Sequence, residues 1–271
     1  MNKSFGKIGF IGAGKMAQAI IKGIIKAGFF SVDNIFAAEP NLEQADKVAQ
    51  EFGIEVFQSN KELVENVDII IFAVKPFIIN DVINDIKDVV TKDKMVVSIL
   101  AGISTDYIQS ELGIAVPVIR VMPNTPALVN EGMSAVCKGT LATNSHLDFV
   151  KDLFKCLGKV IQVEENQIDI VTAISGSSPA FYYYFIDSIA KSAQHMGFDY
   201  NIALLAAAQS ALGAAKMILE TGVAPEILID NVTTKGGTTE VGMNILKSRL
   251  VDKIIDEAVV GTADKAAKLG K

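Results

Sequence analysis

Short apolar runs alternate with amphipathic segments through the first half of the chain. Runs typical of buried strands lie at residues 7–11, 35–38, 56–57, 68–73, 95–99 and 117–121. The segments between them, such as 15–27 and 42–52, place apolar residues at helical spacing. Unbroken apolar strands separated by amphipathic helices predict a parallel sheet covered on both faces, the doubly wound α/β arrangement. Residues 132–137 and 159–163 are expected to extend this sheet, with a helix over 147–157 between them.

The pattern changes near Asn166, and no strand is expected beyond it. Helices are predicted at 168–174, 180–196, 202–220, 225–232, 238–246 and 252–269. The stretch 202–217 is apolar on more than one face, so it must be buried. So much apolar surface in one short segment predicts burial against a second subunit. We therefore predict a doubly wound domain over 1–163 and an all-helical dimerisation domain over 164–271.

Charge and cysteine usage exclude several classes of function. The formal net charge is -6 and the lysines are spread along the chain, whereas a nucleic-acid partner requires a clustered basic face. Cys137 and Cys156 form no CxxC pair and have no histidine pattern nearby, so neither a metal site nor a disulfide framework is expected. We expect a soluble, cytoplasmic protein without a signal peptide. No membrane partner is expected, because the unbroken apolar runs fall far short of the roughly 20 residues that cross a bilayer.

A glycine-rich turn follows the first predicted strand and opens the first predicted helix. Gly12, Gly14 and Ala17 fit the dinucleotide fingerprint G-x-G-x-x-A. In that motif the first glycine makes the tight turn, the second lets the backbone approach the pyrophosphate, and the small third residue packs the helix on the strand. The turn therefore predicts a dinucleotide site, and the alternative is a merely tight turn. The predicted contacts are Gly12, Ala13, Gly14, Lys15, Met16 and Ala17.

Glu39 stands at the end of the second predicted strand, 22 residues after Ala17. A carboxylate at this point would bond the ribose hydroxyls and repel a 2′-phosphate. The alternative is a solvated carboxylate beside Pro40, which would begin the next helix. We predict NADPH or NADH as the cofactor, with NADH favoured by Glu39.

Further cofactor contacts are expected where later strands end, because ligands bind at the carboxyl edge of an open α/β sheet. Lys75 lies between an apolar strand and a proline, which favours a loop beside the cofactor over a plain surface charge. Asn124 lies in a loop fixed by two prolines, and it either presents its amide to the nicotinamide or substrate or belongs to a rigid linker. The other predicted cofactor contacts are Asn60, Ala73, Val74, Pro76, Ala101 and Gly102.

Residues 233–239 read Thr-Thr-Lys-Gly-Gly-Thr-Thr within an otherwise Ala/Leu-rich helical half. Such a run opens a helix whose first backbone N–H groups and hydroxyls are free to hold a small anion. Together with a dinucleotide fingerprint at the other end of the chain, the run predicts a small carboxylate held near a nicotinamide.

Motifs from both halves together resemble the pyrroline-5-carboxylate reductase family. They are the N-terminal fingerprint, Ala73–Pro76, Arg120–Pro126, Ser175–Ala180 and Gly236–Thr239, in family order and at family spacing. The resemblance implies a Rossmann-like domain followed by a helical dimerisation domain. It implies NAD(P)H-dependent reduction of 1-pyrroline-5-carboxylate to L-proline, the last step of proline biosynthesis. It also implies an intertwined dimer, which can assemble further into a pentamer of dimers.

The resemblance assigns roles to the residues of a substrate pocket. Thr239 is the candidate catalytic residue, which would bond the ring nitrogen and supply or orient its proton. The implied substrate-binding set is Glu165, Ser175, Asn231, Thr234, Gly236, Gly237, Thr238 and Thr239. For Asn231 and Glu165, the alternatives are a helix-end amide and a solvated loop charge.

The chain departs from the family pattern at two places. Ser178 stands where the family usually has glycine, and Thr234-Lys235 stands where it often has Ser-Pro. Neither change removes an obvious chemical group. Lys235 nevertheless removes a proline constraint from the substrate loop and adds a positive charge close to the predicted anion site.

Two rival functions have the same layout. A β-hydroxyacid dehydrogenase needs a catalytic lysine on a helix of the second domain, but the chain has no lysine between Ser175 and Lys191. A catalytically silent nucleotide-binding or assembly protein would have no reason to keep both the Gly-Gly-Thr-Thr turn and the nicotinamide loops. The two histidines, His146 and His195, are predicted to be surface or capping residues, and the tyrosines 182–184 to make packing and subunit contacts.

Overall fold

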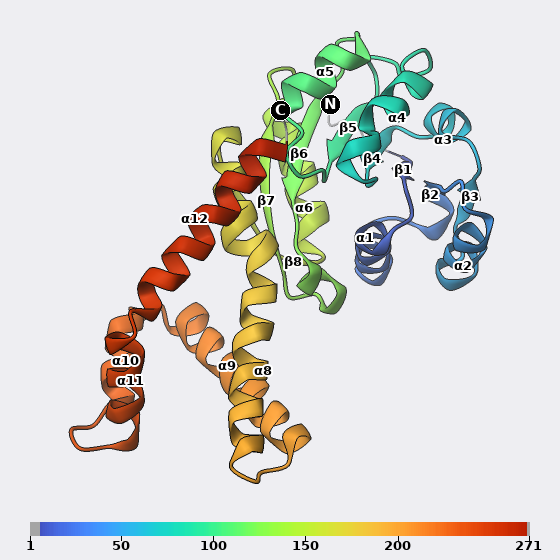
Figure 1. Cartoon of the computed structure of the whole chain (residues 1–271). Coiled ribbons are helices and arrows are strands. Elements are labelled where there is room, and N and C mark those ends of the chain that lie inside the picture. The colour runs from blue at the N-terminus through green and yellow to red at the C-terminus, as the bar shows by residue number, and fades with distance from the viewer. Residues whose placement is uncertain (1–5, 270–271) are drawn as a thin grey trace. The chain divides into compact units, whose positions relative to one another are not determined.

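The computed structural model describes residues 6–269 (Figure 1). The chain divides into two compact units. The first runs up to Ser177 and includes the C-terminal segment from Thr262 on, and the second is Ser178–Gly261. The domain boundary between residues 163 and 164 stays a prediction.

An eight-stranded sheet forms the centre of the first unit, with the order β3-β2-β1-β4-β5-β6-β7-β8 (Figure 1). The strands are β1 (Ile8–Ile11), β2 (Ile35–Ala38), β3 (Glu55–Phe57), β4 (Ile69–Phe72), β5 (Met95–Ser98), β6 (Val118–Met122), β7 (Gly132–Lys138) and β8 (Gly158–Gln162). The chain runs from β1 outwards to β3 and then returns to β4 on the other side of β1. Strand order therefore reverses between β1 and β4, which is where open α/β sheets bind ligands. The predicted α/β fold class is confirmed.

One strand pair differs from the parallel sheet that the sequence predicts. β6 and β7 pair antiparallel, whereas all the other neighbouring strands are parallel. The connection from β6 to β7 contains only a short 3-10 helix, η3 (Thr125–Val129). A parallel return needs a crossover of a dozen or more residues, so this short connection makes β7 turn back beside β6.

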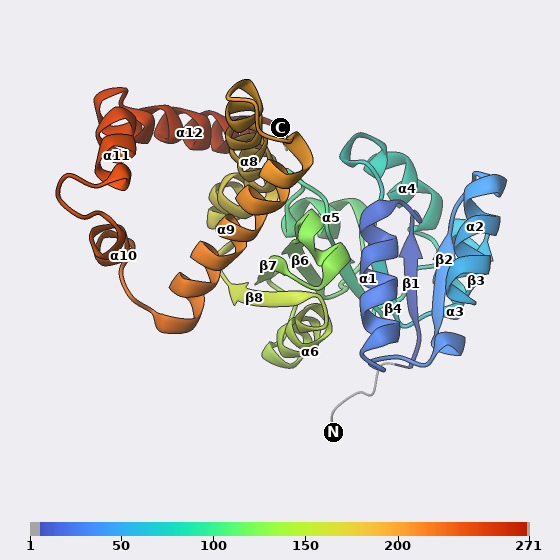
Figure 2. The same cartoon turned by 90° about the horizontal axis from the view of Figure 1, so that it is seen from below.

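Helices cover both faces of the sheet (Figure 2). One core joins the strands to α1 (Lys15–Lys26), α2 (Leu42–Phe52) and α6 (Asn144–Lys155). The other core joins them to α3 (Asn60–Asn66), α4 (Ile79–Ile86) and α5 (Thr105–Leu112). Along β4, Ile69 and Ile71 face the first core, whereas Ile70 and Phe72 face the second. This alternation is the period of two expected of a strand that is buried on both faces.

Beyond β8, the described residues form helices joined by short turns, as the sequence predicts. This part of the chain contains a 3-10 helix η4 (Glu165–Gln167), α7 (Ile168–Val171), a π-helix η5 (Thr172–Ser177), α8 (Ser178–His195), α9 (Tyr200–Thr221), α10 (Pro225–Val232), α11 (Thr238–Ser248) and α12 (Val251–Leu269). The helix expected over 168–174 thus changes from an α-turn into a π-turn at Thr172. Such π-turns are rare and occur frequently at functional sites.

The second unit exposes much of its apolar surface within one copy of the chain. α8 and α9 pack against each other (Figure 2), but Tyr182, Ile189 and Leu205 remain 60–70% exposed. Among residues 6–269, α9 is the one helix long and apolar enough to cross a membrane by length and composition. Counting unbroken apolar runs missed this helix, because Gln209, Ser210 and other residues interrupt it.

Candidate active site

The fingerprint turn between β1 and α1 is shaped to admit a ligand. Gly12 has a φ of +92°, and a Cβ there would lie 3.0 Å from the carbonyl oxygen of Ala73, so only glycine fits. Gly14 has open space where its Cβ would be, and it caps α1 without any side-chain bond. The first N–H groups of α1 therefore point at an uncovered surface, which fits the pyrophosphate of a dinucleotide.

Glu39 lies beside this turn. Its Oε2 accepts a hydrogen bond from the Ala13 N–H (3.2 Å), and its Oε1 accepts one from the Asn41 N–H (3.1 Å). The Ala13 carbonyl in turn accepts bonds from the side-chain amides of Gln18 (2.7 Å) and Gln44 (3.0 Å). The structure therefore brings the fingerprint and the predicted ribose carboxylate together at one edge of the sheet.

The loops after β4 and β5 lie at the same edge. The Ala73 N–H donates to the Ile11 carbonyl (2.9 Å), and Val74 approaches the position of Gly12. Lys75 is exposed and begins the 3-10 helix η2 (Pro76–Ile78). After β5, Ala101 and Gly102 are half-buried, and Gly102 has a φ of +76°.

Asn60 and Asn124 are already engaged within the protein. Asn60 Nδ2 donates to a carboxylate oxygen of Asp85 (3.1 Å). Asn124, which is 8% exposed, accepts from the Met133 N–H (2.9 Å) and donates from Nδ2 to the Ser175 carbonyl (3.0 Å). Asn124 thereby fixes the π-helix to the sheet, so any amide contact with a ligand would use its second N–H or the second lone pair of its oxygen.

Glu165 is part of a charged network and is not the solvated loop charge of the alternative reading. Its two oxygens accept from the Thr105 N–H (2.8 Å), the Thr105 hydroxyl (2.6 Å) and Arg120 Nη1 (3.3 Å). Asp169 lies 3.9 Å from the other terminal nitrogen of Arg120. The sequence analysis did not predict Thr105 as a site residue, and it included Arg120 in a family motif without assigning it a role. An arginine inside the apolar run 117–121 was the available signal.

The remaining substrate-set residues belong to the second unit, apart from Ser175, whose hydroxyl donates to the Val171 carbonyl (3.0 Å). Asn231 lies in the last turn of α10, and residues 233–237 form the turn into α11. Gly237 is the N-cap of α11 and makes no side-chain cap bond, so Thr238 and Thr239 occupy the first turn of an uncapped helix. Both threonines are exposed. This end of the helix is suited to an anion.

Glu240 shares this helix end and was not predicted. Its Oε2 accepts a hydrogen bond of 2.7 Å from the Gly236 N–H. A negative substrate group approaching the turn would meet this carboxylate, and Lys235 supplies an exposed positive charge in the same turn. A carboxylate four residues after the glycine, in the first turn of the predicted helix, was the sequence signal that could have found it.

Cysteine, histidine and metal chemistry have little support at this site. Burial raises the pKa of the Cys137 thiol to about 12, so the thiol stays neutral and is a poor nucleophile. His146 forms a reciprocal capping box with Thr143 at the start of α6, which confirms its capping role. In the part of the chain that the structure describes, no cluster of three His, Cys, Asp or Glu side chains could hold a metal ion.

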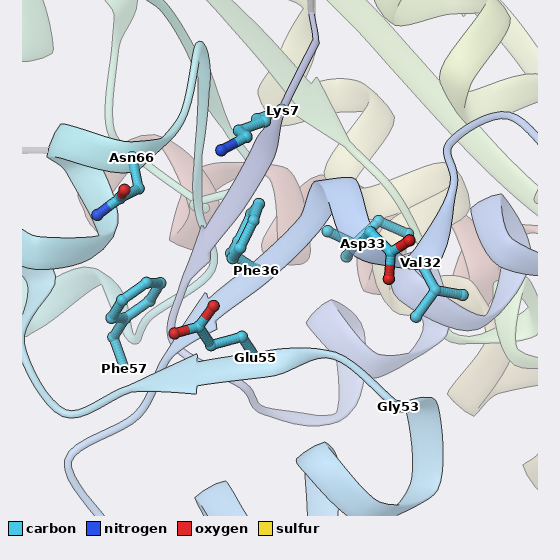
Figure 3. Close-up of a pocket in the computed structure, with 9 residues that line it drawn as sticks. Lys7, Val32, Asp33, Phe36, Gly53, Glu55, Phe57 and Asn66 are labelled. Carbon is cyan, nitrogen blue, oxygen red and sulfur yellow. The ribbon is translucent and has the colours of Figure 1, made fainter.

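A cleft of about 620 Å³ lies at the opposite edge of the sheet (Figure 3). It is lined by residues around the starts of β1, β2 and β3, including Lys7, Asp33 and Glu55. The Lys7 ammonium lies 5.4 Å from the centre of the Phe36 ring. Because ligands of open α/β sheets bind at the carboxyl edge, this cleft is separate from the candidate site.

Comparison with known proteins shows which families the chain is similar to. Residues 165–269 match the family model described as pyrroline-5-carboxylate reductase dimerisation, which supports self-association, and residues 7–102 match that of NADP oxidoreductase, coenzyme F420-dependent. Pyrroline-5-carboxylate reductase 1 of Bacillus subtilis is 35% identical over 98% of this chain and 90% of its own length. The enzyme of Methanosarcina acetivorans is 39% identical over 98% of both chains. The crystal structure of Plasmodium falciparum pyrroline carboxylate reductase with NADP bound is 30% identical, with a TM-score of 0.90 over 100% of both chains.

The reversal of strand order at β1, the open fingerprint turn and the matched models define a nicotinamide-dependent oxidoreductase. Within that class, the chain belongs to the pyrroline-5-carboxylate reductase family.

Proposed function

We propose that this protein reduces 1-pyrroline-5-carboxylate to L-proline with NAD(P)H, as the last step of proline biosynthesis. The observation that carries the proposal is the similarity over 98% of the chain to reductases of this name, which spans both the fingerprint and the Gly-Gly-Thr-Thr turn. The direct test is oxidation of NADH or NADPH by the purified protein when pyrroline-5-carboxylate is supplied.

The proposed mechanism requires little acid–base catalysis by protein side chains. A cyclic imine is electrophilic once its nitrogen is protonated, and the bound nicotinamide supplies the hydride to its carbon. The protein has to position the two reactants and stabilise charge. We assign the N–H groups of Gly236, Gly237 and Thr238 to the substrate carboxylate, which would displace the Glu240 carboxylate from the Gly236 N–H (2.7 Å) and the Thr234 carbonyl from the Gly237 N–H (2.9 Å). The Thr239 hydroxyl bonds the ring nitrogen and orients its proton.

The other substrate-set residues complete the proposed pocket. These are Ser175, Asn231 and Thr234, whereas the Glu165 carboxylate is engaged with Thr105 and Arg120. Lys235 supports carboxylate binding through its charge, which offsets the neighbouring Glu240. The rival reading as a β-hydroxyacid dehydrogenase is not favoured, since a 3-hydroxyisobutyrate dehydrogenase is only 15% identical and shares the fold alone.

We also propose that the protein works as a cytoplasmic dimer, which assembles further into a pentamer of dimers. The exposed apolar faces of α8 and α9 support a dimer, because a monomer would leave them in water. Light scattering on the full chain distinguishes a monomer, a dimer and a decamer. A monomer at micromolar concentration would contradict both levels of assembly.

Replacing Glu39 by serine is expected to shift cofactor preference from NADH towards NADPH. The carboxylate lies beside the fingerprint turn, where it repels a 2′-phosphate, and serine removes that charge. The measurement is the ratio of kcat/KM for the two cofactors. Glu43→Ser is the matched control, because Glu43 loses the same charge on an exposed face of α2. An unaltered ratio in Glu39→Ser would refute the ribose assignment.

A further inference from the structure

Arg120 is buried in the sheet with more donors than partners. It lies in β6 opposite Cys137 of β7, and it is 4% exposed. Among the described residues, its Nε and Nη2 find no hydrogen-bond acceptor. Nη1 bonds Glu165 at 3.3 Å, and Nη2 has only the charge of Asp169 at 3.9 Å. A buried guanidinium is costly unless it is paired, so Glu165 and Asp169 are held here by the need to neutralise it.

Glu165, which is paired with Arg120, also binds the first residue of α5. Thr105 is the first residue of that helix, and both its N–H and its hydroxyl donate to the Glu165 carboxylate at 2.8 and 2.6 Å. Thr105 is 1% exposed. An anion that accepts the first N–H of a helix also interacts favourably with the positive end of the helix dipole. Ser104 is the N-cap of α5 and accepts from the Tyr107 N–H (3.1 Å), and Glu165 supplies a second acceptor at this helix end from a distant part of the chain.

The capped helix end terminates a loop that is predicted to contact the cofactor. The loop leaves β5 after Ser98, includes Ala101 and Gly102, and ends where α5 begins at Thr105. Glu165 itself begins the segment that leads through α7 into the π-helix with Ser175. One carboxylate thus connects a loop that is predicted to contact the cofactor with the segment that leads to Ser175, a predicted substrate-binding residue.

We propose that Arg120, Glu165 and Thr105 form a positioning network that sets the 99–104 loop for cofactor binding, so that Glu165 acts on the reaction through this loop. The effect of the network on catalysis rests on the proposed function. Its effect on cofactor binding can be measured without the substrate. Arg120 orients the Glu165 carboxylate, Glu165 links Arg120 to Thr105, and Thr105 fixes the end of the loop. None of the three is a catalytic residue in this scheme.

The test measures the dissociation constant of NADPH in the absence of substrate, by the change in its fluorescence. Glu165→Ala and Thr105→Val are expected to raise it, by about tenfold for the loss of charge-assisted bonds in Glu165→Ala. Thr105→Ser keeps the hydroxyl and should recover most of the loss caused by Thr105→Val. Asp106→Asn removes an exposed charge from the same helix turn and serves as the control.

Hydrogen exchange supplies a second measurement, which does not depend on the cofactor. Amides of residues 99–108 should exchange faster in Glu165→Ala than in Asp106→Asn, because the Thr105 N–H loses its acceptor. Glu165→Gln keeps an acceptor for that N–H but loses the charge opposite Arg120, so its exchange and its NADPH affinity should be intermediate. Glu165→Ala leaves Asp169 as the remaining carboxylate beside the buried Arg120, so its thermal stability is measured as well, whereas Thr105→Val keeps the Arg120–Glu165 pair intact.

A direct substrate role for Glu165 gives different results. In that case Glu165→Ala raises the KM for the imine, leaves the NADPH dissociation constant unchanged, and is not mimicked by Thr105→Val. That outcome would overturn the positioning network. Failure of the proposed function is distinguishable, because it appears as an unmutated protein that binds NADPH but does not oxidise it with pyrroline-5-carboxylate.

Discussion

Replacing Thr239 by alanine is expected to lower turnover at least about tenfold, which is about 1.4 kcal/mol in the activation barrier. The reason is the placement of its hydroxyl in the first turn of α11, where no side chain caps the helix. Removing the hydroxyl leaves the ring nitrogen of the imine without its proposed partner at the moment of hydride transfer. Affinity for NADPH should change little, since the fingerprint and its neighbouring loops are untouched.

Two further variants separate chemistry from structure at this turn. Thr239→Ser keeps the hydroxyl and should retain much of the turnover. Thr233→Ala removes a hydroxyl that donates to the Ile229 carbonyl at the end of α10, so it reports on destabilisation of the turn alone. Turnover of Thr239→Ala equal to that of the unmutated protein would remove Thr239 from the mechanism.

Replacing Gly14 by alanine is expected to weaken cofactor binding by at least about tenfold without loss of thermal stability. A Cβ at Gly14 meets no protein atom within 4 Å, and the backbone there (φ -71°) suits any residue. The methyl group would instead occupy the space that lets a pyrophosphate approach the start of α1. A loss of affinity in a fully stable protein would therefore locate the cofactor at this turn.

Gly28→Ala is the control for this substitution. Gly28 also has open space around it, but its φ of +63° makes alanine costly there. It lies at the other end of α1, so this variant should lose stability and keep cofactor affinity. Unchanged NADPH affinity in Gly14→Ala would contradict the placement of the dinucleotide.

The sequence predicted most of the elements because their burial leaves a strong pattern. The runs around Ile8 and Ile69 are apolar on both faces, and the structure buries them completely between two layers of helices. The antiparallel β7 was not predicted, because apolar pattern carries no strand direction. The shortness of the connection after Met122 was the physical signal for it, and it was visible in the sequence.

The site was predictable where one local segment makes it and less so where distant segments meet. The turn at Gly12 and the run at Gly236 are each recognisable from a few consecutive residues. By contrast, Glu165 takes its partners from Thr105 and Arg120, which are 60 and 45 residues away. The π-turn likewise has no sequence period of its own, and a carbonyl within it is bonded by Asn124, 51 residues before Ser175.

The central claim is that this chain reduces a cyclic imino acid with a nicotinamide cofactor. The most direct test follows NADH and NADPH absorbance with the purified full chain, with and without pyrroline-5-carboxylate. We predict that either cofactor is oxidised only when the imine is present, with L-proline as the product. Absence of oxidation with both cofactors, in a protein shown to bind them, would contradict the proposed function.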